Sequence, residues 1–444
     1  MEREQTTCLP APIYKEMFLS PAFTDSDDAL FEAYFGTKRE EIEKIFLSGN
    51  QQQREALMEA LDNRFYTKFK ARNRIKIRAE AEMRYEQLVQ QANSIPQYIT
   101  ACCLPGPDCN PEGLGKSIQS ETDYTKLLDP RNDVLFMGNS PAEILALHYD
   151  SLAQNDVITA YEAKRLLLLT SLLEPFQSES IDQDLKGLLN KIQRYVTTNV
   201  FTSFPNSDGL FVGYQSYTIV QDRIDQSFSG LYDPQKRYDN RYHRLVQTTQ
   251  PVRYAHKIGN VYIFPREKRP ATAVLKAITK AKDRAPINPH DVEDRLGIMF
   301  AVLGDPNINT DTKNQRDELA GNVFSALMKK FEDRISIEQD DNLGQRSSSD
   351  KIDWLRYQVK ILGGHPLHRL ELIYFDRKGF FDYYYRTGRK GNGAVGHPLY
   401  EIDRVVGAFP LLFPQDIYWN FYQTFNVEGL IRERRDQVLR RLTS

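Results

Sequence analysis

The sequence predicts an α+β protein in which a mainly helical N-terminal region precedes a domain built on a mixed β-sheet. Three observations predict this class. The chain has 444 residues, which is enough for two or three domains. Residues 27–95 carry charged and apolar residues in a helical pattern with few breakers, whereas short apolar runs alternate with amphipathic stretches from about residue 250. We therefore expect a helical accessory or targeting region over 1–235 and the sheet domain over 236–444.

The N-terminal region is expected to contain two helical blocks, which form two subdomains if the chain breaks between them. Residues 96–132 hold five Pro and three Gly and predict a loop at that break. The second block begins at residues 140–143, Ser-Pro-Ala-Glu, where a capping serine precedes Pro and Glu in the first turn. Helical spacing continues over Ala160–Leu173 and Ile181–Val196.

The C-terminal region is expected to alternate strands and helices. A four-residue turn, Asp-Arg-Lys-Gly at 376–379, predicts a hairpin between its last two strands. An Arg-rich amphipathic helix is expected at 431–442. The expected strands are Val261–Phe264, Leu296–Leu303, Leu355–Leu362, Leu367–Phe375 and Phe380–Arg386, and the expected helices are Thr272–Lys282 and Gln315–Phe331.

Composition excludes several classes of protein. Hydrophobic residues make up 41% of the chain and the formal net charge is −2, as in ordinary globular proteins and unlike a general polyanion binder. No apolar run approaches the roughly 20 residues of a membrane span, and the N-terminus lacks a signal-peptide core, so we expect a cytoplasmic protein without a membrane partner. A specialised export route would leave no such signature. The basic segment Lys68–Arg84 also contains Glu80 and Glu82, which favours a solvated amphipathic helix over a nucleic-acid face.

The most informative stretch is a basic junction between a strand and a helix. Arg266 and Lys268 follow the strand at 261–264, and Thr272 and Lys276 lie one turn apart on the helix that begins there. Free backbone amides and the positive end of the helix would add to these groups. The junction therefore predicts a polyphosphate site, with a solvated basic helix start as the alternative.

Carboxylates near this junction suggest a metal site. Asp294 precedes the buried strand at 296–303, and a carboxylate beside a phosphate site is a common Mg²⁺ ligand, with Mn²⁺ as a substitute. If the turn of the predicted hairpin has two residues, Glu371, Asp382 and Tyr384 share a face. A three-residue turn would move Asp382 to the other face.

These residues resemble the synthetase domain of the RelA/SpoT alarmone synthetases, which has a nucleotidyltransferase-like fold. The family reads Arg-x-Lys-x-x-x-Ser-x-x-x-Lys, then Asp-x-x-Gly-Ile-Arg, then Gly-x-Lys-Gly followed by Glu-x-Gln-x-Arg-Thr, and finally His-x-x-Tyr or His-x-x-x-Tyr. The resemblance covers roughly residues 250–405. The matching residues here are Arg266, Lys268, Thr272 and Lys276, then Asp294, Gly297 and Ile298, then Lys378, Gly379, Asp382, Tyr384, Arg386 and Thr387, and finally His397 and Tyr400.

The resemblance implies a pyrophosphokinase that moves the β,γ-pyrophosphate of ATP to a ribose 3′-hydroxyl of GDP, GTP or an adenine nucleotide and releases AMP. It implies that Arg266 lies on or near the adenine and that Lys268, Thr272 and Lys276 hold the phosphates. Asp294 would carry Mg²⁺, and Asp382 or Glu371 would be the second metal ligand or the base. The acceptor would be bound by Tyr384, Arg386, His397 and Tyr400.

The chain departs from the family pattern on the acceptor side. Met299 replaces an Arg, Asp382 a Glu and Tyr384 a Gln, and no Gly-Tyr-x-Ser-x-His segment follows the donor motif. A second interpretation is therefore a catalytically silent nucleotide-binding protein that recruits a protein partner through its N-terminal region. A third keeps the chemistry but uses the 3′ end of tRNA as acceptor, as a toxin or effector would.

Overall fold

The structure is a computed structural model, and the chain divides into two compact units that interleave along the sequence. Unit 1 comprises Met1–Ser180, Pro270–Asp291 and Arg404–Asp436, and unit 2 comprises the rest of the chain. The division predicted from the sequence was two consecutive regions, 1–235 and 236–444. The structure describes residues 32, 34–104, 136–177, 187–192, 195–196, 199–200, 252–253, 260–267, 270–281, 296–302, 311–339, 354–363, 369–385, 397–433 and 436.

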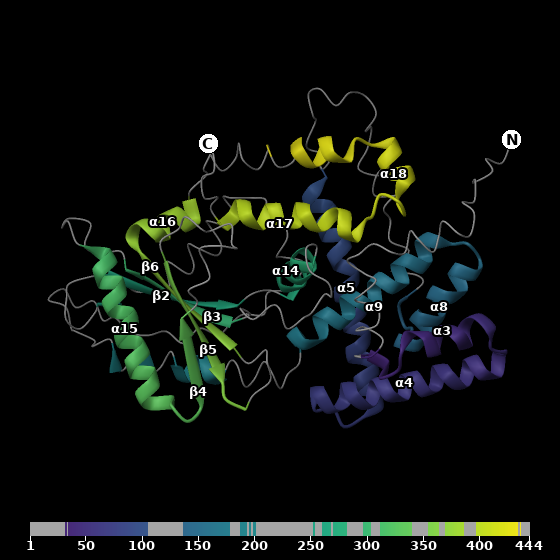
Figure 1. Cartoon of the computed structure of the whole chain (residues 1–444), viewed down its shortest axis with the longest axis horizontal. Coiled ribbons are helices and arrows are strands. Elements are labelled where there is room, and N and C mark those ends of the chain that lie inside the picture. The colour runs from purple at the N-terminus through teal and green to yellow at the C-terminus, as the bar shows by residue number, and fades with distance from the viewer. Residues whose placement is uncertain are drawn as a thin grey trace. The chain divides into compact units, whose positions relative to one another are not determined.

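Unit 1 is helical and is organised around α9, as Figure 1 shows. This helix packs against α5, α8 and α14, and its residues from Ala160 to Leu173 are almost all buried. The helices of unit 1 are α3 (Arg39–Ser48), α4 (Gln51–Asn73), α5 (Arg78–Cys103), α8 (Pro141–Ala153), α9 (Val157–Gln177), α14 (Pro270–Ala281), the end of α17 (His397–Leu412) from Arg404, and α18 (Trp419–Thr424).

The predicted start of the second helical block is confirmed. The Ser140 hydroxyl accepts a hydrogen bond from the Glu143 backbone N–H at 3.2 Å, and the Glu143 carboxylate accepts one from the Ser140 N–H at 2.7 Å. Pro141 occupies the first turn of α8, where its missing N–H costs nothing. The predicted helix at 160–173 is likewise confirmed within α9.

The loop predicted from Pro96 is wrong for its first residues. Helix α5 continues through Pro96 to Cys103, and the Thr100 hydroxyl donates to the Pro96 carbonyl oxygen at 2.9 Å. Buried Ile95 and Ile99 hold this turn in the core, so tertiary packing outweighs the cost of proline. Cys103 is a buried thiol at the end of the helix.

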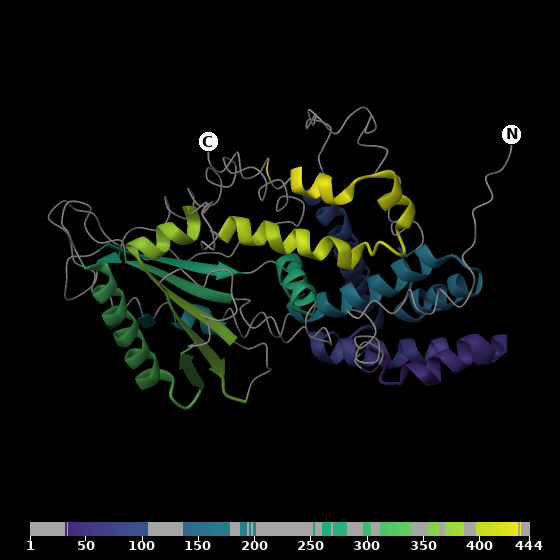
Figure 2. The same cartoon turned by 45° about the horizontal axis from the view of Figure 1, so that its top comes forward.

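Unit 2 is built on a mixed sheet, so the α+β class is confirmed. The described strands form one six-stranded sheet in the order β1-β2-β3-β6-β5-β4. Figure 2 shows strands of this sheet lying side by side. Strands β3 and β6 are parallel, and the other neighbouring pairs are antiparallel. The strands are β1 (Val252–Arg253), β2 (Asn260–Glu267), β3 (Leu296–Val302), β4 (Ile335–Gln339), β5 (Trp354–Ile361) and β6 (Arg369–Asp376).

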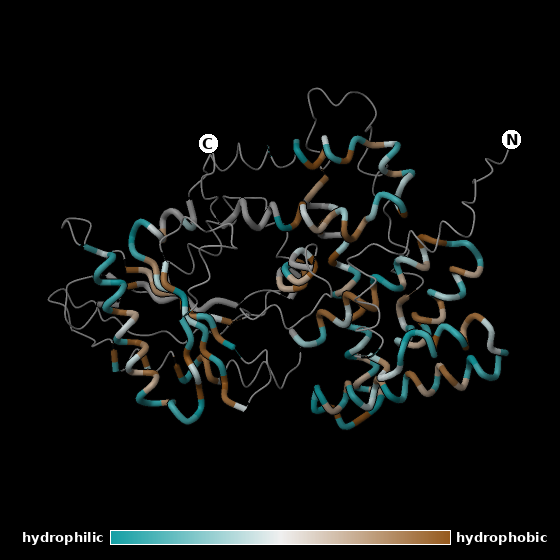
Figure 3. The backbone as a smooth tube through the Cα atoms, viewed as in Figure 1, coloured by the Kyte–Doolittle hydropathy of each residue, from teal (hydrophilic) through white to brown (hydrophobic). Residues whose placement is uncertain are grey.

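One face of this sheet packs against α15 (Thr312–Phe331). Ile298 and Phe300 of β3 and Leu372 of β6 belong to the same buried cluster as Leu319 and Val323 of α15. All seven residues of β3 are buried, as expected for a central strand with both faces covered. Figure 3 shows hydrophilic and hydrophobic residues alternating along α4 and α15, as in helices with one buried face.

The predicted hairpin is wrong. Residues Arg377–Tyr385 form helix α16, which follows β6 directly and packs against β6 and β3. The Asp376 carboxylate accepts a hydrogen bond from the Gly379 N–H at 2.6 Å, which is the geometry of a helix N-cap. Phe380 and Tyr383, three positions apart, are both buried, which matches helical rather than strand spacing.

Candidate functional site

The centre of the sheet aligns residues from separate segments of the chain. Gly297 of β3 lies opposite Glu371 of β6 in the parallel pair. Arg266 of β2 is the register partner of Gly297 on its other side, and Gln358 of β5 is the partner of Glu371. These four positions form one row across the sheet, which we call the central row. The row lies in unit 2.

Glu371 lies on the sheet face opposite α15. Its neighbours Leu370 and Leu372 belong to the α15 cluster, and side chains alternate along a strand. The Glu371 residue is only 4% exposed, and its carboxylate forms an ion pair with the Arg356 guanidinium of β5. A buried carboxylate needs such a partner, because desolvation of an unpaired charge is costly. Arg356 therefore compensates the charge of Glu371 and fixes its position.

An aromatic cluster covers the far end of the same face. Trp354 of β5 lies with its ring centroid 5.6 Å from those of Phe375 and Tyr383, and the Phe375 and Tyr383 centroids are 5.0 Å apart. Tyr383 belongs to α16, so this helix closes the end of the face where β6 finishes. Glu371 lies near the beginning of β6, five positions before Asp376 and away from this cluster.

The helical structure of 377–385 changes the choice between the two candidate acids. Asp382 and Tyr384 belong to helix α16, so they are not strand partners of Glu371. The structure describes the backbone of these two residues but not their side chains. Glu371 instead pairs with Gly297 and Gln358. Of the two candidates, Glu371 is the one that the sheet places beside the Gly-Ile motif.

The predicted ATP-binding residues are distributed over two units. Arg266 is the seventh residue of β2 in unit 2, and Thr272 and Lys276 belong to α14 in unit 1. The predicted strand-to-helix order is confirmed, because β2 ends at Glu267 and α14 begins with Pro270 at its first position. Lys276 is half-buried, whereas Lys268 lies outside the described residues.

The predicted metal site receives only one described carboxylate. Asp294 lies outside the described residues, three positions before Gly297. Across the parts of the chain that the structure describes, no three His, Cys, Asp or Glu residues come together as a metal-binding group. Glu371 is committed to Arg356, so the described residues do not fit Mg²⁺ as they stand. The metal remains a prediction that depends on Asp294.

The predicted acceptor-binding residues lie at and beyond α16. Arg386 is outside the described residues, and His397 and Tyr400 lie in the first turn of α17, whose side chains there are not described. Tyr357 of β5 packs edge-on against Tyr374 at 5.8 Å and near Phe324 at 6.1 Å. These contacts put Tyr357 on the α15 face, where it packs against the core of the sheet.

Two residues of β5 at the candidate site were not predicted from the sequence. Arg356 and Gln358 alternate with Leu355, Tyr357 and Val359, which pack toward α15. The available signal was the alternation of polar and apolar residues along this strand, which places Arg356 and Gln358 on the face away from α15. Their pairing with Glu371 depends on the β5–β6 register, which composition does not reveal.

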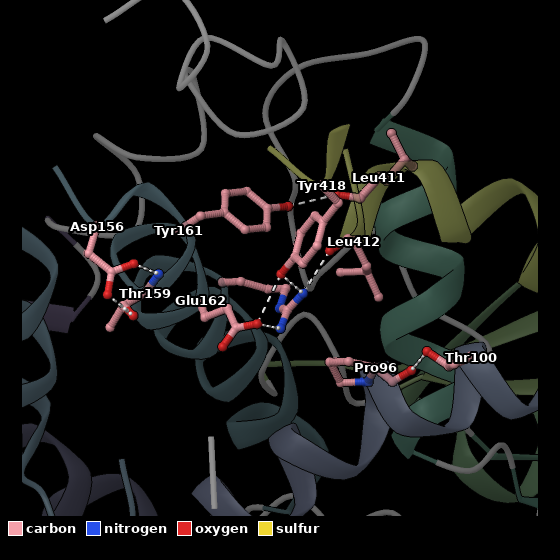
Figure 4. Close-up of polar contacts among 10 residues, drawn as sticks. Pro96, Thr100, Asp156, Thr159, Tyr161, Glu162, Leu411, Leu412 and Tyr418 are labelled. Atoms are coloured by element: carbon pink, nitrogen blue, oxygen red, sulfur yellow. Dashed lines mark hydrogen bonds and ion pairs between the residues drawn. The ribbon is translucent and has the colours of Figure 1, made fainter. Parts of the chain in front are cut away.

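Unit 1 contains a second buried polar cluster, drawn in Figure 4. The Arg165 guanidinium on α9 donates to the Leu412 carbonyl oxygen at 2.8 Å and to the Tyr418 hydroxyl at 3.1 Å. The Tyr418 hydroxyl donates to the Glu162 carboxylate at 3.0 Å, and Tyr161 donates to the Leu411 carbonyl at 3.0 Å. Burial raises the pKa of Tyr418 well above its ordinary value, so its hydroxyl keeps its proton. The cluster connects α9 to the end of α17 and to Tyr418 in the segment after it, and we interpret it as structural.

The chain was compared with protein-family models, curated proteins and solved structures. No protein-family model, curated protein or solved structure matches this chain. Among the described residues, no helix is both long and apolar enough to cross a membrane.

Proposed function

We propose that unit 2 is a nucleotidyltransferase-like domain with RelA/SpoT-type pyrophosphotransferase activity. Its donor would be ATP and its acceptor a nucleotide with a free ribose 3′-hydroxyl, and AMP would be the product. The central row carries this proposal, because it brings the strand of the Arg-x-Lys motif, the Gly-Ile motif and a buried glutamate onto adjacent strands. These segments are far apart in the sequence, and the sequence resemblance alone did not require their alignment.

The chemistry assigns a direct role to Glu371. The acceptor 3′-oxygen attacks the β-phosphorus of ATP, the bond from that phosphorus to the α,β-bridging oxygen breaks, and AMP leaves with the bridging oxygen. The acceptor hydroxyl must lose its proton, and the Glu371 carboxylate takes it in this proposal. Arg356 is a positioning residue here, because it holds the Glu371 carboxylate through their ion pair. Within unit 2, Arg266 and Lys268 remain the predicted ATP-binding residues, whereas Thr272 and Lys276, which the resemblance also implies, belong to unit 1.

The test is acceptor-dependent release of AMP from ATP in the presence of Mg²⁺, with a panel of guanine and adenine nucleotides and tRNA. Wild-type protein should release AMP with at least one acceptor. Glu371→Gln should lower the rate by about 10²-fold or more, because a positioned base contributes about 10²–10⁴-fold to such a transfer. ATP binding, measured by calorimetry, should remain.

Glu338→Gln is the matched control for this variant. Glu338 lies on β4 opposite Gln358, in line with the central row, but it is exposed at the sheet edge and pairs with Lys360. An exposed ion pair contributes little to stability, so the control should keep full activity. Full activity of Glu371→Gln at matched thermal stability would rule out the assigned role.

A second candidate function is a catalytically silent nucleotide-binding module. The observation that favours it is the burial of Glu371 and its ion pair with Arg356, an arrangement that also occurs in purely structural sites. ATP binding by wild-type protein without AMP release, across all nucleotide and tRNA acceptors, would select this candidate. Acceptor-dependent AMP release would reject it.

A further inference from the structure

The turn between α4 and α5 belongs to unit 1 and carries exposed side chains next to a buried one. Arg74 closes α4 in the left-handed conformation, with φ of 54°, and the Ile75 N–H donates to the Lys70 carbonyl oxygen at 2.9 Å. Ile75 is 7% exposed and anchors the turn in the core. The next two residues, Lys76 and Ile77, are exposed before α5 begins at Arg78. The turn therefore has a defined backbone and presents Lys76 and Ile77 to solvent.

This turn is at the end of a strongly basic stretch. Residues 63–79 contain seven Lys or Arg residues and no Asp or Glu. Lys68, Arg74 and Lys76 are exposed, whereas Arg72 reaches the buried Glu174 and Arg78 pairs with Glu82 on α5. The acidic residues of α5 begin only at Glu80. The basic character is thus concentrated at the turn and the last turns of α4, and the seven residues are Arg64, Lys68, Lys70, Arg72, Arg74, Lys76 and Arg78.

Ile77 has no role in folding that the structure reveals. It is 65% exposed and occupies the N-cap of α5, without a side-chain hydrogen bond to the helix. Serine, threonine, aspartate and asparagine are preferred at this position because they satisfy a free backbone N–H. An aliphatic side chain here weakens the helix start and leaves apolar surface in water. It is an exposed aliphatic side chain among the basic residues Arg74, Lys76 and Arg78, as in surfaces that bind a partner both apolar and negatively charged.

We propose that the α4–α5 turn binds the surface of a membrane that contains anionic lipid. Lys70, Arg74 and Lys76 would meet the lipid phosphates and carboxylates, and Ile77 would enter the apolar layer beneath them. A lipid surface fits this arrangement, since its negative charge is diffuse and its interior is apolar. Single-stranded nucleic acid is favoured less, because it calls for exposed aromatic side chains for stacking, and the aromatic ring beside the turn, Tyr66, is buried and lies 3.7 Å beneath the Arg78 guanidinium. This contact is peripheral and requires no spanning helix, and it departs from the expectation that the chain has no membrane partner.

The test is co-sedimentation of the full chain with phosphatidylcholine vesicles, with and without phosphatidylserine. Wild-type protein should bind only the vesicles with phosphatidylserine, and added salt should weaken that binding. Lys76→Gln should reduce the vesicle affinity about fivefold, the effect of one basic residue near an anionic surface. Ile77→Ser should reduce it about tenfold or more, through loss of the inserted aliphatic side chain.

The Ile77→Ser variant separates binding from folding. Serine is a better N-cap than isoleucine, so the melting temperature of this variant should be equal to or higher than that of wild type while its vesicle affinity falls. Leu47→Ser is the matched control, because Leu47 is 66% exposed near the end of α3 and lies outside the basic turn. Its vesicle affinity should not change.

Three results would overturn the proposal. Equal binding to neutral and anionic vesicles would show that the Lys and Arg side chains of the turn do not drive binding. Unchanged vesicle affinity of Ile77→Ser would show that Ile77 does not insert. Binding of tRNA that both turn variants weaken, in the absence of vesicle binding, would assign the turn to nucleic acid instead. These readouts do not depend on pyrophosphotransferase activity.

Discussion

Gly297 shows how one residue determines the geometry of the candidate site. The backbones of β3 and β6 approach so closely there that an ideal Cβ on Gly297 would lie 2.5 Å from the Glu371 carbonyl oxygen. Real Cβ atoms do not come that close to backbone oxygen, so no other residue fits without movement of β6. The same approach fixes Glu371 in its register position, because the two residues face each other across the parallel pair.

We predict that Gly297→Ala destabilises unit 2 by about 1–3 kcal/mol, the usual cost of overpacking a well-packed core. Urea unfolding of the full chain measures the loss. Gly321→Ala is the matched control, since Gly321 lies within α15 and an added Cβ there meets nothing within 4 Å. Alanine is the better helix former, so the control should gain about 0.5–1 kcal/mol. Equal effects of the two changes would contradict the close-approach explanation.

The candidate site was predictable only in part at this scale. Arg266 and Gly297 were identified from motif spacing, and Glu371 from a predicted hairpin that the structure does not contain; the sheet aligns all three in one row, whereas Arg356 was not identified. Motif spacing records neighbours along one chain segment. The partner of a buried carboxylate is set by the register between two strands that are separate in sequence, and register follows from packing of the opposite face.

Individual elements were predicted well where local signals and tertiary packing agree. The capping box of α8 and the continuous apolar run of β3 both have the predicted structure. The segment after β6 was misassigned because its alternating pattern also fits a helix of nine residues, and the Asp376 N-cap decides in favour of the helix. Strand β4 was missed, since it has five residues at the sheet edge and only Ile335 of these is buried.

The buried polar cluster around Arg165 of α9 gives a prediction at the element scale. Tyr418→Phe removes a hydroxyl that both accepts from Arg165 and donates to Glu162 inside the core of unit 1. We expect a loss of stability of about 2–3 kcal/mol, because two charged, buried groups lose a partner together. Thermal unfolding of the full chain measures it.

Tyr161→Phe is the control for this change. The Tyr161 hydroxyl makes a single hydrogen bond to the Leu411 carbonyl, a neutral acceptor, so we expect a loss of about 1 kcal/mol. A larger loss of stability for Tyr161→Phe than for Tyr418→Phe would show that Arg165 and Glu162 are not stabilised by the Tyr418 hydroxyl.

At the scale of the whole molecule, the chain leaves unit 1 and returns to it twice. Helix α14 and the segment from Arg404 to Asp436 both belong to the unit that contains α9. The sequence predicted the helix of α14 but not this assignment, because membership in a unit depends on long-range packing. Val274 and Ile278 of α14 are fully buried, and α14 packs against α9, which lies far earlier in the chain.

The interior of unit 1 holds two titratable groups with opposite effects on stability. Burial raises the pKa of Glu174 from 4.5 to about 7, against the opposing charge of Arg72. Burial, followed by the nearby charge of Lys164, lowers the pKa of His148 from 6.5 to about 4, although its Nδ1 donates to the Ala160 carbonyl at 2.7 Å. Each shift corresponds to about 3 kcal/mol between the two protonation states.

The two linkages run in opposite directions as pH rises. Between pH 4.5 and about 7 the unfolded chain has lost the Glu174 proton while the folded chain keeps it, so stability falls through this window. Between about pH 4 and 6.5 the unfolded chain carries the His148 proton while the folded chain does not, so stability rises. In the wild-type protein these contributions largely cancel over the range that the two windows share.

A variant that lacks one of the two groups should therefore show a pH dependence of the free energy of unfolding that largely cancels in the wild-type protein. Glu174→Gln leaves the His148 linkage alone, so the free energy of unfolding should rise by about 3 kcal/mol relative to wild type as pH increases from 4.5 to 7. His148→Gln removes the opposite linkage, so its stability relative to wild type should fall by about 3 kcal/mol from pH 4 to 6.5. Urea unfolding of both variants and wild type across this pH range measures the differences, in which all shared groups cancel. A difference for Glu174→Gln that stays constant with pH would mean that this carboxyl ionises in the folded protein as it does in the unfolded chain, and that water or Arg72 compensates its burial in full.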